Sequence, residues 1–261
     1  MTRRSFARRH AKLTFIGGPL AFVVGLLAVL AGELQYARSR DYAADPKFDL
    51  ERSFPGEGPT IELAVVGDST VAGLGTEDVD DTLPVQIGLE LAARTGRPVH
   101  VRGYGVSGAT TGSVLEQQLP DVPHDFDVLV FEIGSNDVTH MTSLDEIERR
   151  TRTLIDVGRS HAPIVVLGTA GRLDTPNFKR PLRDIIVARA SQVRGRQITA
   201  ARAESIGVVE IGGHRIGDEF NATKGAVSFD GFHPARAGYG VWARALAQEV
   251  AEQLDRVKSP A

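Results

Sequence analysis

Residues 61–75 read IELAVVGDSTVAGLG, an apolar run that ends in a glycine-rich turn carrying Ser69 and Thr70. The apolar part, residues 61–67, has the length and β-branched composition of a buried strand. Similar runs follow at 99–106, 126–134, 163–169 and 206–212. Segments with helical spacing lie between and after them, at 83–94, 114–119, 144–159, 181–205 and 235–257. Strands that alternate with helices predict a five-stranded parallel sheet covered by helices on both faces.

The turn after the first strand is the first candidate for a functional site, because such sheets bind ligands at the carboxyl ends of their strands. It lacks the lysine of a P-loop and the spacing of a dinucleotide fingerprint, and Val71 replaces the second glycine of a G-x-S-x-G elbow. What remains is a Gly-Asp-Ser turn that we expect to place Ser69 at the start of a helix. Unpaired N–H groups there favour a developing negative charge, although a serine at that point equally fits a helix cap.

A base for a serine nucleophile lies near the end of the chain, in FDGFHPARAGYG at residues 229–240. Asp230 and His233 are three residues apart, and Pro234 suits the first position of a following helix. A carboxylate at this spacing can accept from the Nδ1–H group of His233 and direct the other ring nitrogen toward a hydroxyl. The other six histidines lack this arrangement.

Acyl transfer to a serine also needs hydrogen-bond donors where the carbonyl oxygen becomes negative, and two further strand ends offer them. Gly108 in YGVSGATTG can bring its N–H group close to a ligand, and Asn136 in EIGSNDV carries an amide NH₂ group. Taken singly, Gly108 also fits a plain turn, and Asn136 a helix cap or an Asx-turn. The order of all four features at successive strand ends favours one catalytic site.

Four short blocks in this order resemble the SGNH hydrolase family, also called GDSL esterases and lipases. They are GDS at 67–69, the glycine of VSGAT at 106–110, GSND at 134–137 and DGFHP at 230–234. The resemblance covers residues 61–254 and implies a flavodoxin-like three-layer α/β/α sandwich. It implies a serine esterase without a cofactor, with Ser69 as nucleophile, His233 as base and acid, and Asp230 as its orienter. The implied oxyanion hole consists of the N–H groups of Ser69 and Gly108 and the side chain of Asn136.

The N-terminus predicts a membrane-spanning helix. Residues 13–32 carry no charge, and a helix of 20 residues spans about 30 Å. The basic residues Arg3, Arg4, Arg8, Arg9 and Lys12 precede this run, so we expect a cytoplasmic N-terminus and an extracytoplasmic catalytic domain. The alternative is a signal peptide cleaved after residues 29–31, VLA, which would release a secreted enzyme. The basic flank fits an ordinary or a twin-arginine export signal.

The predicted organisation is therefore an anchor or signal peptide at 1–32, a polar stalk at 33–59 and the hydrolase domain at 60–261. Five of the 30 basic residues and none of the 33 acidic ones lie in the anchor, which leaves the remainder with an excess of eight acids. This charge argues against a nucleic-acid partner. The chain has no cysteine, and its acids Asp68, Asp137 and Asp230 lack a metal-binding histidine pair, so no metal site is expected.

The expected substrate is a small ester. The segment GRLDTPNFKR at residues 171–180 follows the fourth strand and is placed to rim an acyl pocket, and no long apolar lid is present. Short-chain esters and O-acetyl groups of cell-envelope glycans remain open as substrates. A catalytically silent binding module on a membrane stalk is the alternative from another class, and the intact set of Ser69, Asp230 and His233 argues against it.

Overall fold

A computed structural model describes residues 21–37 and 39–258 of the chain. Its centre is a six-stranded sheet in the order β1-β3-β2-β4-β5-β6. The strands are β1 Glu51–Phe54, β2 Ile61–Gly67, β3 Val99–Gly105, β4 Val128–Glu132, β5 Ile164–Gly168 and β6 Gly207–Val209. The five predicted strands are present and parallel, but the count of five was wrong, because β1 adds an antiparallel edge strand beside β3.

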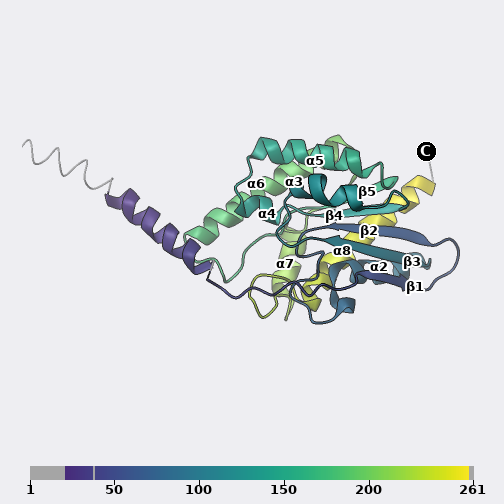
Figure 1. Cartoon of the computed structure of the whole chain (residues 1–261), viewed down its shortest axis with the longest axis horizontal. Helices are drawn as coiled ribbons and strands as arrows, with labels where there is room; N and C mark the ends of the chain where they lie inside the picture. Colours follow the sequence, from purple (N-terminus) through teal and green to yellow (C-terminus); the bar gives the residue numbers. More distant parts are fainter. Residues whose placement is uncertain (1–20, 38, 259–261) are drawn as a thin grey trace, which may run out of the picture.

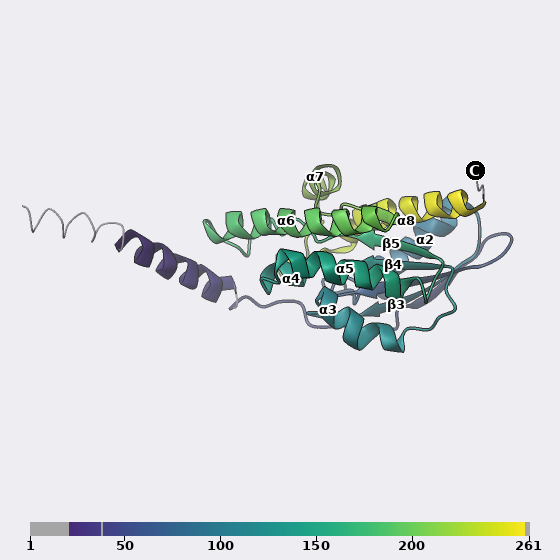
Figure 2. The ribbon, with the colours of Figure 1, turned by 90° about the horizontal axis from the view of Figure 1, so that it is seen from above.

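Helices cover both faces of the sheet and make the three layers of an α/β/α sandwich (Figures 1 and 2). Helices α2 Leu83–Thr95 and α8 Arg236–Lys258 pack against each other on one face, and α5 Leu144–Gly158 and α6 Leu182–Ala203 on the other. The side chains of β2 alternate between two hydrophobic cores. Leu63 and Val65 belong to the α2 and α8 core, whereas Ala64 and Val66 belong to the α5 and α6 core. This two-sided burial explains why the strand is almost entirely apolar.

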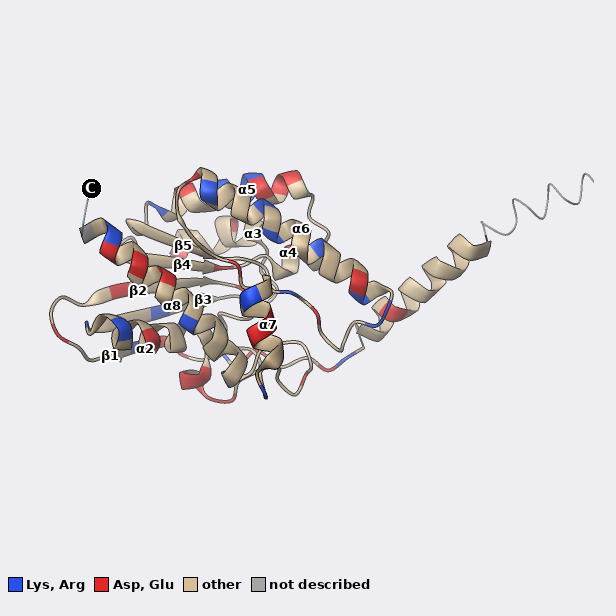
Figure 3. Cartoon of the chain, turned by 180° about the vertical axis from the view of Figure 1, so that it is seen from behind, with Lys and Arg blue, Asp and Glu red and all other residues tan. Residues whose placement is uncertain are grey.

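Shorter elements connect these layers. They are η1 Val79–Asp81, α3 Thr111–Ser113, the π-helical turn η2 Val114–Gln118, η3 Leu119–Asp121, α4 Ser135–Thr139 and α7 His214–Ala222. The predicted helix at 114–119 is therefore a π-helical turn that leads into a 3₁₀ turn, and α7 is an additional helix. Acidic and basic residues are interspersed along α5, α6 and α8 (Figure 3).

The segment predicted as a stalk is largely part of the domain. Strand β1 pairs with β3 in the register Glu51 to Arg102 and Phe54 to Val99. Phe54 packs on the hydrophobic core beneath α2. This strand was not predicted from the sequence, because ERSF alternates polar and less polar residues instead of forming an apolar run. An edge strand buries only part of its surface and needs no such run. The domain thus begins before the predicted boundary at residue 60.

A helix over residues 21–37 projects from the body of the molecule (Figure 1). Ala37 of this helix is buried against a cluster that includes Val138 and Ile186, and Glu33 accepts a hydrogen bond from the N–H group of Leu182. Within residues 21–37 and 39–258, no helix has both the length and the apolar character needed to cross a bilayer. Residues 13–20 of the predicted span lie outside the described residues.

Candidate active site

The structure brings Ser69, His233 and Asp230 together into one hydrogen-bonded row. Ser69 follows the end of β2, and the other two lie in the loop that precedes α8. His233 Nε2 is 3.1 Å from Ser69 Oγ, and His233 Nδ1 is 2.6 Å from Asp230 Oδ2. All three residues are buried, with 8%, 6% and 2% of their surface exposed for Ser69, His233 and Asp230. This is the geometry in which an imidazole can accept a hydroxyl proton while a carboxylate holds its other N–H group.

The turn that carries Ser69 differs from the prediction. No helix begins there: residues 69–75 form successive turns, and α2 begins only at Leu83. The N–H group of Leu74 donates to the carbonyl of Ser69, and that of Ala72 donates to Asp68. Ser69 is therefore not a helix cap, and a helix dipole cannot account for stabilisation of negative charge beside it.

Gly75 packs this turn against the histidine loop. Its φ is +92°, a conformation that glycine adopts readily. A Cβ atom here would lie 2.3 Å from the carbonyl oxygen of Pro234 and 3.1 Å from Cβ of His233. Gly75 has no role predicted from the sequence, but the structure shows that only a glycine lets the Ser69 turn approach the loop of His233 this closely.

Asp230 is surrounded by donors. Its Oδ1 accepts from the N–H groups of Phe232 and His233 and from the Ser228 hydroxyl, at 2.8, 2.9 and 2.7 Å. Its Oδ2 accepts from the ring of His233 and, at 3.0 Å, from the N–H group of Ala43. Burial alone raises the pKa of Asp230, but the hydrogen bonds from Ala43, His233, Phe232 and Ser228 together hold that pKa below its ordinary value. The carboxylate is therefore ionised and fixed in orientation.

Asn136 and Gly108, the predicted oxyanion donors, lie on neighbouring segments. Asn136 is in α4, directly after β4, and its Nδ2 donates to the carbonyl of Ala109 at 2.9 Å and to Oδ2 of Asp68 at 3.2 Å. Gly108 precedes Ala109 and has a φ of +81°. Both protons of the Asn136 amide are engaged, so an oxyanion must share one of them, and the longer bond to Asp68 is the one we expect to yield.

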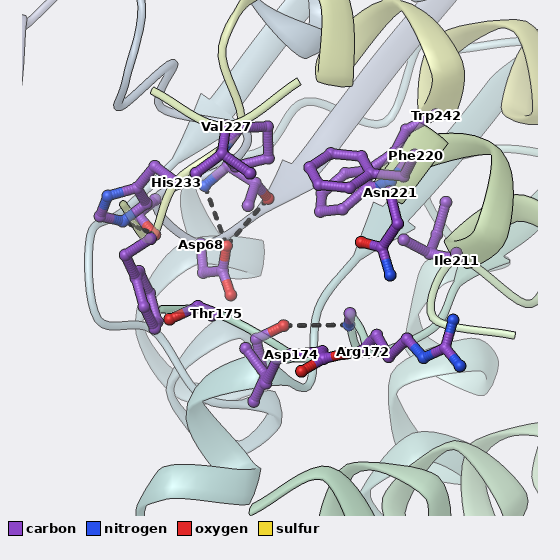
Figure 4. Close-up of a pocket in the computed structure, with 18 of the residues that line it drawn as sticks. Asp68, Arg172, Asp174, Thr175, Ile211, Phe220, Asn221, Val227, His233 and Trp242 are labelled. Carbon is purple, nitrogen blue, oxygen red and sulfur yellow. Dashed lines mark hydrogen bonds between the residues drawn. The ribbon is translucent and has the colours of Figure 1, made fainter. Parts of the chain in front are cut away.

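A pocket of about 80 Å³ opens over Ser69 and His233 (Figure 4). One wall is apolar, and Phe220 stacks on Trp242 there with ring centroids 5.4 Å apart. The opposite wall comes from residues 171–175, the first half of the segment predicted to rim the pocket. Arg172 and Asp174 contribute polar groups to it. The second half of that segment turns away, and its Phe178 packs against Phe232.

Sequence reasoning missed four contributors to this site. Ala43 and Tyr42 come from the predicted stalk, where Tyr42 packs edge-on against Phe232 and His233 with ring centroids 5.3 and 6.4 Å away. Asn177 is buried and donates to the carbonyl of Asp230. Glu132 is buried below the Ser69 turn and bonds to Thr70. Two of them carried a signal, since Asn177 lies in the segment predicted to rim the pocket and Glu132 is a lone acid at the end of the apolar strand VLVFE.

The three acids considered as metal ligands are not gathered in one place. Asp137 accepts hydrogen bonds from the N–H and hydroxyl groups of Thr111, both at 2.9 Å. Among the residues that the structure describes, no group of three or more histidine or acidic side chains is arranged to hold a metal ion.

The contact between Ala43 and Asp230 leads to a first prediction. Ala43→Pro removes the N–H donor without removing a side-chain contact, and we expect kcat to fall on the order of tenfold as one support of Asp230 is lost. The assay is hydrolysis of p-nitrophenyl acetate. Ala44→Pro is the matched control, since Ala44 is exposed and makes no hydrogen bond to the site. Equal activity of the two variants would contradict a role of this segment in catalysis.

Comparison with known proteins extends these observations. The profile of the GDSL-like Lipase/Acylhydrolase family matches residues 65–241. A GDSL-like esterase of Mycobacterium tuberculosis is 27% identical over 253 residues, which cover 89% of this chain and 80% of that protein. A catalytic mutant of an acetylxylan esterase from Geobacillus stearothermophilus superposes with a TM-score of 0.57 at 20% identity, covering 75% of this chain and 95% of the other. A lipase/acylhydrolase from Enterococcus faecalis superposes equally well, at 0.57 and 19% identity, covering 74% and 96%.

Proposed function

Because the chain belongs to the GDSL-like Lipase/Acylhydrolase family, we propose that it hydrolyses small carboxylic esters through an acyl-enzyme formed on Ser69. The observation that carries this proposal is the continuous row of hydrogen bonds from Ser69 through His233 to Asp230. Proximity to the imidazole is what turns an unreactive hydroxyl into a nucleophile.

In the proposed reaction, His233 Nε2 takes the proton of Ser69 as Oγ attacks the ester carbonyl. Asp230 holds the Nδ1–H group and stabilises the imidazolium that forms. The proton then passes from His233 to the departing alcohol, and the acyl group remains on Ser69. A water molecule repeats the sequence, with His233 as its base, and releases the acid.

The negative oxygen of each tetrahedral intermediate needs donors that are already in place. We assign this role to the N–H groups of Ser69 and Gly108 and to Nδ2 of Asn136. The hydrogen bond of Asn136 to Asp68 orients the amide before substrate arrives. Loss of one such donor costs about a hundredfold or more in turnover in comparable sites.

The pocket favours a short acyl group. Its volume of about 80 Å³ is smaller than the ~150 Å³ of an engineered cavity that admits benzene. We therefore expect kcat/KM to fall roughly tenfold or more from p-nitrophenyl acetate to the octanoate, since extra methylenes have no room. A panel of acetate, butyrate and octanoate esters measures this, and a rise in kcat/KM with chain length would contradict the assignment.

O-acetyl esters of cell-envelope glycans are a second candidate. The pocket carries polar side chains beside its apolar wall, among them Arg172, Asp174 and Asn221 (Figure 4). Such groups suit the hydroxyl-rich alcohol part of an acetylated sugar. One of the proteins of similar fold is an acetylxylan esterase, which lends this substrate class some support. Release of acetate from acetylated polysaccharides tests it.

We further propose that the catalytic domain lies outside the cytoplasm, held to the membrane by the N-terminal segment. The charge-free run at 13–32 and the basic residues before it support this. So do the exposed apolar side chains of the helix at 21–37, where Phe22 and Leu27 keep 73% and 59% of their surface exposed. Cell fractionation with a protease-accessibility assay tests it, and a catalytic domain in the cytosolic fraction would end it.

A fluorophosphonate probe gives the direct test of the nucleophile. We expect covalent labelling of Ser69, located by mass spectrometry of the peptide, and suppression of labelling by excess short ester. A catalytically silent binding module would remain unlabelled. Hydrolysis should also persist in a metal chelator, whereas its loss there would favour a metal-dependent hydrolase.

A further inference from the structure

Three polar side chains form a buried row beneath the Ser69 turn. Thr70 Oγ1 lies 2.9 Å from Oδ1 of Asp68 and also hydrogen-bonds Oε2 of Glu132 at the end of β4. Asp68 and Glu132 are each 1% exposed, so both carboxyl groups are buried. Gly168 of β5 pairs with Glu132, and Leu246 of α8 lies beside Gly168. Apolar groups therefore adjoin the side chain of Glu132.

The number of protons in this row is limited. A threonine hydroxyl has one proton to donate, and an ionised carboxylate can only accept. If both carboxyl groups were ionised, Thr70 could donate to one of them and would face the other with a lone pair. Two hydrogen bonds at Thr70 Oγ1 therefore require that one of the two carboxyl groups carries a proton.

The contacts of the two groups decide which one it is. Asp68 accepts the N–H group of Thr70 at 3.0 Å on Oδ1 and the amide of Asn136 at 3.2 Å on Oδ2. Glu132 receives no N–H donor within the described residues, and its Oε1 is buried without a partner. Negative charge is costly at a buried carboxyl group without donors, so the proton resides on Glu132. Burial and then the charge of Asp68 raise the pKa of Glu132 well above its ordinary value.

We propose that Glu132 is a protonated positioning residue that donates to Thr70, so that Thr70 donates to Asp68 and Asp68 holds the amide of Asn136. The two hydrogen bonds are thus donated in the same direction, from the neutral carboxyl group of Glu132 through Thr70 to the ionised carboxylate of Asp68. It fixes the Ser69 turn from below and orients the Asn136 amide from the side. Its effect on turnover rests on the proposed function, whereas the protonation of Glu132 does not.

Other titratable groups near the row are few. Tyr239 of α8 is buried and donates to the carbonyl of Leu74, and its burial raises its pKa well above 10.0. Burial is the main cause that raises the pKa of Asp68, to about 6. The charge of Asp137 also raises the pKa of Asp68. All of these groups remain in a Glu132 variant.

The first test measures proton uptake on folding. An unfolded Glu132 ionises above its ordinary pKa of 4.5, but the folded one keeps its proton. Rising pH must therefore destabilise the wild type relative to Glu132→Gln, which cannot ionise. We expect the ratio of their unfolding constants, wild type over variant, to rise about tenfold per pH unit between roughly pH 5 and 7. Reversible denaturation of the full-length protein in mild detergent gives this ratio.

The exposed Glu116→Gln is the matched control, and its ratio to the wild type should not change with pH. A ratio for Glu132→Gln that is equally independent of pH would overturn the proposal. If Glu132→Gln fails to fold, infrared spectroscopy of the wild type at neutral pH decides. The carbonyl band of a protonated carboxyl group should be present and should shift when glutamate is isotope-labelled. A missing or unshifted band also overturns the proposal.

The second test is kinetic and separates the two carboxyl groups. Glu132→Leu should lower kcat on the order of tenfold with little change in KM, and Glu132→Gln, which keeps a donor, should recover most of that loss. Asp68→Asn should lose activity, because the new NH₂ group would face donors whose hydrogen bonds Asp68 accepts. The reverse pattern, with Asp68→Asn tolerated and Glu132→Gln impaired, would place the proton on Asp68 and overturn the direction of the row. A completely inactive wild type would refute the proposed function and leave the linkage and infrared results readable.

Discussion

Replacement of Ser69 by alanine is expected to lower kcat for p-nitrophenyl acetate by ~10⁵-fold or more, because it removes the atom that attacks the ester in the proposed mechanism. The fold should be retained. The Ser69 side chain makes its hydrogen bond to His233 at the edge of an open pocket, and no core packing depends on it. Steady-state hydrolysis and the unfolding midpoint measure the two effects separately.

Ser160→Ala is the matched control for this substitution. Ser160 is exposed and caps the end of α5 through a hydrogen bond to the carbonyl of Val157. Its loss should leave turnover within about twofold, as substitutions at exposed positions away from a site usually do. Residual activity of Ser69→Ala near that of the control would refute the assignment of Ser69 as nucleophile.

The second large effect is expected at Asp230. Asp230→Asn should lower kcat on the order of 10⁴-fold, because an amide favours the wrong tautomer of His233, the proposed base. The structure adds a further reason. Asp230 accepts five hydrogen bonds through two oxygens, whereas asparagine would turn an NH₂ group toward two or three of those donors. The measurement is kcat/KM for p-nitrophenyl acetate, with the exposed Asp156→Asn as control.

The same variant should change the dependence of stability on pH. The pKa of Asp230 is lower in the folded chain than its ordinary value of 3.8, so the folded state binds this proton less readily than the unfolded one. The carboxylate therefore adds stability that is fully present above 3.8 and is lost as pH falls toward the lower folded value. The stability advantage of the wild type over Asp230→Asn should shrink over that acid range. An advantage that does not change between neutral pH and pH 3 would contradict the lowered pKa.

The fold was predictable to the extent that burial leaves a pattern in the chain. Strands β2 and β4 are buried on both faces and therefore consist almost entirely of apolar residues. Strand β1 has no such pattern, because it lies at the edge and pairs on one side only. Its four residues take their conformation from β3, a partner about 50 positions away in the sequence, which local reasoning does not reach.

The turn after Ser69 is a second place where local sequence did not predict the structure. A serine that follows a strand commonly begins a helix, and the sequence of this turn does not contradict that expectation. The chain instead forms successive turns from 69 to 75, because the backbone of Gly75 packs closely against Pro234 and His233. A contact between segments about 160 residues apart thus overrides a local preference.

The sequence by itself predicted which residues would carry the chemistry of an esterase. Ser69, Gly108, Asn136, Asp230 and His233 follow strand ends or precede a helix, and parallel strands bring their carboxyl ends to one edge. Tertiary structure alone decided how those residues are held. The donor from Ala43 to Asp230 and the bond of Glu132 to Thr70 both join segments that are far apart in the chain. A backbone N–H group is present at almost every residue, so the sequence does not indicate which one donates to Asp230. The protonation state of a buried acid such as Glu132 depends on its hydrogen-bond partners, which only the tertiary structure brings together.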